Sequence, residues 1–377
     1  MPAREQEPLS EFDREEIAEV LAMYSPLFPS GIPELSVLSG GYLNRSYLIV
    51  NGASQFVLRN YKFNTQRAAI AYEHELLQHL PRTVNQAAIA KPLRARHGGT
   101  IVSAGEQHYA LFPYLKGTPF GRGNLRSLEN AGRTLAAYHN AVRGYVPRTQ
   151  QRATYGTVAH LDWVARHGLG LQDLWQHVML SGYRSERERR INDGIGFLVD
   201  EARQIEKALG GTTYASLPQL VIHNDFGPQN LLRVGDDVVG ILDFDLVAWD
   251  ARVYDLATAL TWLGEDIAAS PPYAILSGDR AWTQSRARAQ AVFRGYITGL
   301  ELPLTRAEIE ILPWMLRAFG MWLAVWYLDL RRAGKEWYPE ELSGLLEYLK
   351  WLRSNAVAYV SQVIHDTAGE INRLRMS

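Results

Sequence analysis

The spacing of hydrophobic residues along this chain changes from one period to another. Over residues 11–24 apolar side chains recur at helical spacing, which predicts an amphipathic helix. Over residues 34–114 apolar and polar side chains follow the pattern of short strands bounded by turn residues. We expect strands at 35–38, 46–50, 55–59, near Leu93, at 101–103 and at 109–113.

One helix, predicted at 68–80, interrupts these strands, and two glycine-containing pairs provide turn signals. Asn51-Gly52 supplies the positive φ angles of a tight hairpin, and Gly98-Gly99 marks a second turn. The first part of the chain is therefore predicted to be a small antiparallel sheet with a helix laid on it.

Beyond Gly117 the apolar pattern is mainly that of long helices. We expect these helices at 125–142, 161–169, 186–208, 254–263, 280–300, 306–332 and 339–365. A strand-rich segment at 220–246 interrupts them. The predicted fold is therefore α+β with two lobes, an N-terminal lobe of residues 1–115 built on an antiparallel sheet, and a larger, mainly helical C-terminal lobe of residues 116–377.

Composition restricts the class of protein. In 377 residues, 47% are hydrophobic and 21% charged, which is typical of a globular protein and argues against disorder or a coiled coil. The formal charge of -1 provides no bulk positive field, so we expect no nucleic-acid partner. The absence of cysteine excludes disulfides, thiolate zinc sites and a cysteine nucleophile.

Neither the start of the chain nor its most apolar stretch has the pattern of a targeting or membrane segment. Residues 1–12 are acidic and polar, where a secretory signal begins with basic and then apolar residues. Residues 311–328 contain Pro313 and Arg317, and the apolar run that remains is too short to span a bilayer. We expect a buried helix there, no membrane partner and a cytoplasmic protein.

Polar residues with catalytic potential gather in the segment Val221-Ile-His-Asn-Asp-Phe-Gly-Pro-Gln-Asn-Leu-Leu232. Its Gly-Pro pair predicts a loop between two apolar strands. A second apolar strand ends in Ile241-Leu-Asp-Phe-Asp245. A buried, structural role is expected for His223.

The two segments are expected to form a hairpin. With Val234 opposite Val239, Asn230 falls opposite Asp243, and directly opposed side chains begin about 4.5–5.5 Å apart. An amide oxygen and a carboxylate that meet one cation form an oxygen-only ligand set, which suits Mg²⁺. Asp225 precedes the first strand and is expected nearby.

The motifs His223-x-Asp-x-x-x-x-Asn230 and Ile241-Leu-Asp-Phe-Asp245 resemble those of the aminoglycoside phosphotransferase and choline kinase superfamily. Gly132-Arg-Thr-Leu-Ala-Ala-Tyr-His139 and Tyr254-Asp-Leu-Ala257 are similar to two helical segments of the same enzymes. The resemblance implies a bilobal, protein-kinase-like fold. It also implies transfer of the γ-phosphate of ATP, with Mg²⁺, to a hydroxyl of a small molecule.

The resemblance also implies a role for individual residues. Asp225 is the expected catalytic proton acceptor, and Asn230 and Asp243 are the expected Mg²⁺ ligands. Asp245 stands where protein kinases have a glycine. Asp255 is expected either to cap its helix or to anchor the catalytic loop.

Further roles fall on the first lobe. Arg59 is the expected phosphate-binding cation, with Lys62 as the alternative, and Glu73 is its expected ion-pair partner, with Glu75 as the alternative. The remaining nucleotide-binding residues are Ser39, Gly40, Gly41 and Asn44 in a phosphate-covering turn, which also fits an ordinary hairpin, and Phe112 and Tyr114 in the adenine-binding hinge.

The acceptor is the least determined part of the prediction. Tyr254-Asp-Leu-Ala257 and Leu312-Pro-Trp-Met-Leu-Arg317 are most similar to the homoserine kinase type, which favours homoserine or another amino alcohol. Aminoglycosides, choline, ethanolamine and sugars stay open, and Glu265, Asp266 and Asp329 are too few to indicate an aminoglycoside pocket. A protein Ser/Thr kinase of the same fold and a nucleotide-binding pseudoenzyme also stay open. The sequence does not decide between ATP and GTP, nor does it determine the oligomeric state.

Overall fold

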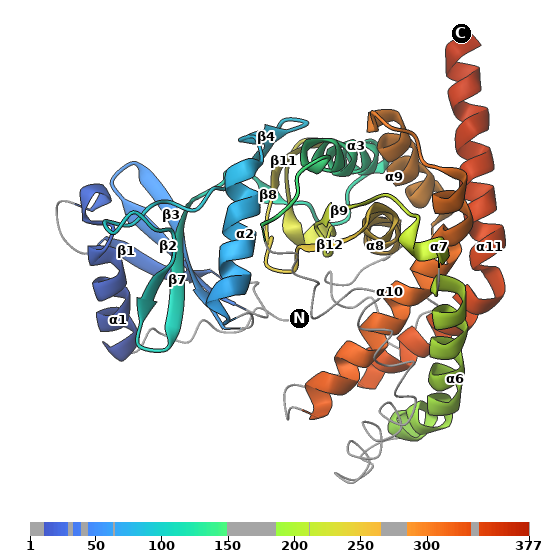
Figure 1. Ribbon diagram of the computed structural model, residues 1–377, viewed down its shortest axis with the longest axis horizontal. Coiled ribbons are helices and arrows are strands. Elements are labelled where there is room, and N and C mark those ends of the chain that lie inside the picture. Colours follow the sequence, from blue (N-terminus) through green and yellow to red (C-terminus); the bar gives the residue numbers. More distant parts are fainter. Residues whose placement is uncertain are drawn as a thin grey trace. The chain divides into compact units, whose positions relative to one another are not determined.

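The chain forms two compact units in the computed structural model, which describes residues 11–28, 33–38, 44–62, 65–148, 186–210, 212–264, 285–332 and 339–376 (Figure 1). The first unit contains the described residues up to Thr118, a short piece that begins at Pro147, and Val239–Asp245. The second contains Pro119–Val146 and the other described residues. Asp243 and Asp245 therefore belong to the first unit, and Asp225 and Asn230 to the second.

The first unit is built on a five-stranded antiparallel sheet with the order β1-β2-β3-β7-β6. Its strands are β1 (Glu34–Leu38), β2 (Arg45–Asn51), β3 (Ser54–Tyr61), β6 (Val102–Ala104) and β7 (Gln107–Pro113). Its helices are α1 (Glu11–Ala22), the short 3-10 turn η1 (Ser25–Leu27) and α2 (Arg67–His79). The predicted antiparallel sheet with a helix is confirmed.

The alternation of side chains along β3 assigns each helix to a face of the sheet. Leu58 pairs with Tyr47 and Leu111 and lies in a hydrophobic cluster with the apolar residues of α1. Arg59, the next residue, points to the opposite face, where it meets Glu73 of α2. One face of the sheet is therefore core, and the other carries the charged residues expected to bind nucleotide.

Three details of the first unit differ from the sequence prediction. Residues near Leu93 form no strand, although the Leu93 amide donates to the Leu111 carbonyl at 2.8 Å. The first hairpin turn is Gly52-Ala53, because Asn51 still pairs with Ser54, and Gly52 has φ +58°. The unpredicted β4 (Thr83–Val84) and β5 (Ala87–Ile89) pair with each other, and β5 pairs in parallel with β11 (Asp237–Ile241).

The second unit is mainly helical. Its helices are α3 (Leu125–Val142), α6 (Glu186–Leu209), α7 (Thr212–Ala215), α8 (Arg252–Gly264), α9 (Arg286–Gly299), α10 (Arg306–Arg332) and α11 (Pro339–Met376). Its other elements are β8 (Thr118–Pro119), β9 (Gln219–Ile222), the 3-10 turn η2 (Pro228–Asn230), β10 (Leu231–Val234) and β12 (Ala248–Ala251). The α+β class is thus confirmed, and the helix predicted at 161–169 lies outside the described residues.

Helix α10 is the centre of the second unit, and α6, α8 and α11 pack against it (Figure 1). In the part of the chain that the structure describes, only Arg306–Leu328 is long and apolar enough to cross a membrane. However, 83% of the apolar 18-residue stretch that qualifies it is buried inside the protein. The predicted buried helix at 311–328 is therefore confirmed.

The hairpin that precedes the second acidic motif is tighter than predicted. β10 ends at Val234 and β11 begins at Asp237, so only Gly235 and Asp236 form the turn, and Gly235 has φ +60°. The predicted register, with Val234 opposite Val239, requires a longer loop. With Val234 opposite Val239, the prediction left residues 235–238 in the turn, whereas Asp237 already belongs to the strand.

Helices α3 and α9 approach so closely that glycine is required at their crossing. A Cβ on Gly295 would lie 1.9 Å from the Glu129 carbonyl oxygen, and one on Gly132 would lie 2.1 Å from the Val292 carbonyl oxygen. Both obstacles are backbone atoms, which cannot rotate away. The side chains that follow Gly132 on α3 therefore depend on this crossing for their positions.

Gly295→Ala is expected to lower the free energy of unfolding by about 1–3 kcal/mol, because the new methyl group forces the two helices apart. The matched control is Gly196→Ala on α6, where a Cβ meets nothing within 4 Å and alanine stabilises a helix by up to about 1 kcal/mol. Denaturant unfolding of both variants is expected to give opposite signs. Equal effects would contradict the close crossing.

Candidate active site

The polar loop of the second unit follows directly from the end of β9. Asn224 leaves the strand with φ +69°, in the left-handed region that asparagine tolerates. Gly227 then precedes the 3-10 turn η2, whose Pro228 fits the first position of such a turn. The loop is therefore sharply bent on both sides of Asp225.

The Asp255 carboxylate anchors this loop from the first turn of α8. Its Oδ2 accepts the backbone N–H of His223 at 2.7 Å, and its Oδ1 accepts that of Asn224 at 2.6 Å. Asp255 is fully buried. If its carboxylate were removed, the two backbone amides would be left without acceptors, which lowers the free energy of unfolding. Of the two roles expected for Asp255, the structure shows the anchor.

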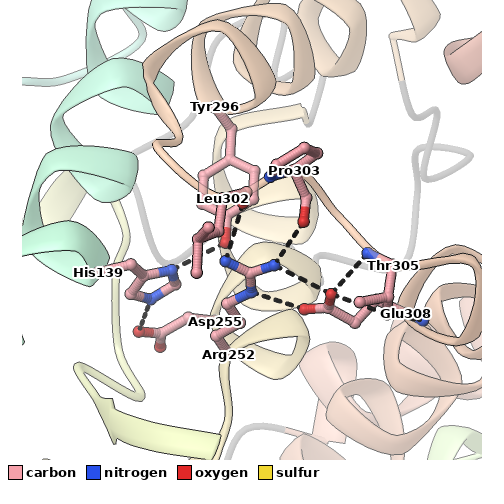
Figure 2. A network of polar contacts seen from close by, with 8 residues as sticks. All are labelled: His139, Arg252, Asp255, Tyr296, Leu302, Pro303, Thr305 and Glu308. Atoms are coloured by element: carbon pink, nitrogen blue, oxygen red, sulfur yellow. Dashed lines mark hydrogen bonds and ion pairs between the residues drawn. The ribbon is translucent and has the colours of Figure 1, made fainter. Parts of the chain in front are cut away.

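His139 of α3 holds Asp255 from the other side (Figure 2). Its Nε2 lies 3.0 Å from Asp255 Oδ2, and its Nδ1 lies 2.8 Å from the Tyr296 hydroxyl. A carboxylate only accepts hydrogen bonds, so His139 Nε2 carries the proton that is directed at Asp255. Tyr296 holds the other ring nitrogen and so sets the orientation of the imidazole.

Two amide side chains hold the Asp225 carboxylate. Gln229 Nε2 donates to Asp225 Oδ1 at 2.9 Å, and Asn230 Nδ2 donates to Oδ2 at 2.7 Å. Asn230 Nδ2 also donates to the Asp225 carbonyl at 2.9 Å. Asp225 is half-buried, whereas His223 is buried and packs edge-on against Tyr138 and Phe226, in the structural role expected for it.

The orientation of the Asn230 amide fits a metal ligand. A carbonyl oxygen only accepts hydrogen bonds, so the group that faces the Asp225 carbonyl is the amide nitrogen. The Asn230 amide oxygen therefore does not contact Asp225. It is a hard oxygen donor of the kind that Mg²⁺ prefers.

In the first unit, Arg59 lies between two carboxylates. Its Nη1 is 3.5 Å from Glu73 Oε1 and 3.0 Å from Asp243 Oδ1. Burial opposes the charge of Arg59, but Asp243 and Glu73 more than offset it and raise its pKa. Burial raises the pKa of Glu73 to about 7, against the effect of Arg59.

Asp243 lies in a strained conformation next to a second acid. Its φ of +59° is in the left-handed region, which costs a non-glycine residue roughly 1–3 kcal/mol. Burial and the neighbouring Asp243 raise the pKa of Asp245 well above its usual range, and Asp245 Oδ2 accepts Asn44 Nδ2 at 2.7 Å. Ionising Glu73, Asp243 and Asp245 together around Arg59 is unfavourable without a further cation, which fits a cation-binding role for Asp243.

His74, next to Glu73 on α2, is buried in its neutral form. Its ring nitrogens bond the Tyr61 hydroxyl at 3.0 Å and Thr100 Oγ1 at 2.7 Å. Burial lowers the pKa of His74 to about 3. The folded protein therefore excludes a proton that the unfolded chain binds below about pH 6.5.

The His74 contribution to stability is consequently expected to fall as the pH drops from 7 toward 3, because only the unfolded state gains this proton. The loss from His74 is about 2 kcal/mol between pH 7 and pH 5, and Glu73 opposes it, because the pKa of about 7 lets the folded state gain a proton on Glu73 before the unfolded state does. His74→Gln removes the His74 contribution, so acidification from pH 7 to pH 5 is expected to cost this variant about 2 kcal/mol less than the wild type. Urea unfolding at pH 7, 6 and 5 measures the difference, and identical pH dependence contradicts the buried neutral histidine.

A buried arginine ties the start of α8 to the segment before α10 (Figure 2). Arg252 Nε and Nη2 donate to the two Glu308 carboxylate oxygens at 2.7 and 3.0 Å. Its Nη1 and Nη2 also donate to the carbonyls of Leu302 and Pro303, at 3.2 and 2.9 Å. The helix that carries Asp255 is therefore fixed at its first residue.

The sequence profile of the phosphotransferase enzyme family matches residues 34–291, which is more than half of the chain and includes both acidic motifs. The chain belongs to the phosphotransferase enzyme family. This confirms the resemblance from which the sequence analysis inferred an enzyme of the kinase type.

Known proteins similar to this phosphotransferase include kinases of small molecules. The homoserine kinase of Brucella anthropi is 27% identical over 281 residues, which are 74% of each protein. The structure of a microcompartment-associated aminopropanol kinase has a TM-score of 0.61 at 18% identity and covers 92% of this chain and 98% of its own. Spectinomycin phosphotransferase, solved with ADP and spectinomycin, has a TM-score of 0.55 at 12% identity and covers 95% and 99%. These structures confirm the protein-kinase-like fold of the phosphotransferase.

The structure brings several predicted site residues of the phosphotransferase together. Asp225 contacts Asn230 in the second unit, and Arg59 contacts Glu73 and Asp243 in the first. Ser39, Gly40 and Gly41 lie outside the described residues.

Other predicted residues have different neighbours. Asn44 is directed at Asp245, and Lys62 Nζ donates to Gln107 Oε1 at 2.6 Å. Phe112 lies under Arg59, and the Tyr114 amide is bonded to the Gln55 carbonyl at 3.1 Å. A hinge hydrogen bond from Tyr114 to a base therefore requires its carbonyl or the loss of this sheet bond.

Three residues at the site of this phosphotransferase were not predicted from the sequence. Gln229 contacts Asp225, His139 contacts Asp255, and Tyr296 contacts His139. His139 and Gln229 lie within the motifs that resemble those of the family, so the sequence indicated that these segments belong to the site. Tyr296 lies in a distant helix, and no local pattern indicates its contact with His139.

Proposed function

We propose that this phosphotransferase moves the γ-phosphate of ATP to the hydroxyl of a small amino alcohol, with homoserine as the first candidate. Support for the acceptor comes from similarity to homoserine kinase over 74% of both proteins and from the fold shared with an aminopropanol kinase. The fold shared with an enzyme solved with ADP supports a nucleotide donor. The observation that carries the proposal is the Asp225 carboxylate, held by two amides on a loop that Asp255 anchors.

In this proposal Asp225 orients the acceptor hydroxyl and takes its proton as the oxygen attacks the γ-phosphorus. Arg59, kept in place by Glu73, binds phosphate oxygens. Asn230 and Asp243 supply the oxygen ligands for Mg²⁺, which when bound neutralises charge on the phosphates. The residues Ser39, Gly40, Gly41 and Asn44 precede β2 in the turn proposed to cover the phosphates, and Phe112 and Tyr114 belong to the proposed adenine-binding hinge.

The test is ADP release with ATP and Mg²⁺ against homoserine, aminopropanol, ethanolamine, choline, a sugar and an aminoglycoside. Phosphorus NMR of each mixture identifies the phosphate ester formed. We expect the highest kcat/KM with homoserine or another amino alcohol. Turnover of the aminoglycoside alone would replace this acceptor with an aminoglycoside, and phosphate found only on added protein would replace it with a protein hydroxyl.

A further inference from the structure

We infer that Gln229 is a positioning residue for the Asp225 carboxylate and that Gly227 is glycine to make room for it. The inference rests on the proposed function, in which Asp225 accepts the proton of the acceptor hydroxyl. Gln229 acts by donating a hydrogen bond to Asp225, and Gly227 acts by leaving the space that the Gln229 side chain occupies.

Gln229 donates a hydrogen bond to the Asp225 carboxylate. A carboxylate only accepts hydrogen bonds, so the Gln229 atom 2.9 Å from Asp225 Oδ1 is the amide nitrogen. Asn230 donates to the other oxygen, Oδ2. Consecutive residues of one 3-10 turn therefore hold the two oxygens of the same carboxylate and fix the plane in which it lies.

Gly227 lies where any side chain would meet the Gln229 amide. Its φ of -139° and ψ of 174° are extended angles open to every residue, so its conformation does not require glycine. A Cβ at this position would lie 2.5 Å from Gln229 Oε1 and 2.7 Å from Nε2. The Gln229 amide therefore occupies the space beside the Gly227 Cα, where a side chain would displace it from Asp225.

Loss of the contact between Gln229 and Asp225 is expected to slow phosphoryl transfer. Phosphoryl transfer depends on the position of the groups around the reacting atoms, and small displacements of such groups lower the rate strongly. Loss of the Gln229 amide removes one of the contacts that set the orientation of the Asp225 carboxylate. The nucleotide is bound elsewhere in the proposal, so its KM does not depend on this contact.

The experiment compares Gln229→Met, Gln229→Ala and Gly227→Ala with the double variant Gly227→Ala/Gln229→Ala. Methionine keeps the length of the side chain and removes only the donor. We expect each single variant to lower kcat for homoserine about 10-fold with the KM for ATP unchanged. The double variant is expected to match Gln229→Ala, because Gly227→Ala acts only by displacing Gln229.

The control is Gln204→Met, since Gln204 Nε2 makes the same contact to an aspartate four residues away, with Asp200 at 3.0 Å, on helix α6. It is expected to keep the wild-type kcat. Wild-type kcat in Gln229→Met, or additive losses in the double variant, overturns the inference.

Denaturant unfolding of the same variants decides the contact without any substrate. Gly227→Ala is expected to lower the unfolding midpoint in the wild type and to leave it unchanged in Gln229→Ala. Equal shifts in both backgrounds overturn the inference. If the shifts differ but the protein phosphorylates none of the tested acceptors, the contact is confirmed and the proposed function is wrong.

Discussion

Asp225→Asn is expected to lower kcat by about 10² to 10⁴, the usual worth of a general base, with little change in the KM for ATP. Asparagine keeps the size of the side chain but cannot take the acceptor proton. Steady-state ADP release with homoserine and saturating ATP and Mg²⁺ measures the effect, and phosphorus NMR confirms the product.

The matched control for this prediction is Asp200→Asn on α6, because Asp200 also accepts a hydrogen bond from a glutamine four residues away. Its kcat is expected to equal that of the wild type. If Asp225→Asn also keeps the wild-type kcat, Asp225 is not the proton acceptor and the mechanism is wrong.

Arg252→Met is expected to lower the free energy of unfolding by about 3–5 kcal/mol, because it leaves the Glu308 carboxylate buried without its counter-ion. Glu308 is fully buried, and among the described residues its other donors belong to Thr305, whose amide lies at 2.8 Å and whose hydroxyl lies at 3.0 Å. Guanidinium unfolding, followed by circular dichroism, measures the loss. The double variant Arg252→Met/Glu308→Leu is expected to recover part of it, since both charges are then gone.

An exposed pair on α10, the helix that carries Glu308, provides the control for Arg252. Arg306 and Glu310 lie 2.6 Å apart, but their side chains are 92% and 61% exposed. Water screens such a pair, so Arg306→Met is expected to leave the unfolding free energy close to that of the wild type. A loss in Arg252→Met no larger than in Arg306→Met would show that burial of the first pair has no effect on stability.

Two helices, α3 and α10, were predicted with the correct bounds, whereas α9 was predicted from residue 280 and begins at Arg286. α3 begins after Asn124, which accepts the Ser127 amide in a capping box, and it ends at Val142 as predicted. α10 likewise spans 306–332 in both the prediction and the structure. Such signals are local, so the sequence alone places these helices.

Short strands escaped prediction because their partners lie far away in the chain. β12 pairs with β9, and Asp250 faces Leu220 across that ladder. β5 pairs with β11 across a much longer separation, with Ala88 opposite Gly240. Two to four residues have no readable period, so only the distant partner makes them strands.

At the candidate site, the two motifs placed Asp225 and Asn230 on one loop, and the resemblance paired Arg59 with Glu73. The structure shows contacts within both pairs. The sequence did not predict that Gln229 also donates to the Asp225 carboxylate. The motif specifies the aspartate and the asparagine but not the residue between them that makes this contact. Nor did it choose between a cap and an anchor for Asp255, since both roles place an acid in the first turn of a helix.

The sequence by itself determined the family, the order of the long helices and the segments that carry the polar chemistry. Those features depend on side-chain type and on the backbone preferences of neighbouring residues, which a linear pattern records. Only the tertiary structure decided that Tyr296 orients His139, that His139 holds Asp255, and that Arg252 is buried against Glu308. These contacts depend on where distant helices cross, and that is set by packing of the whole unit.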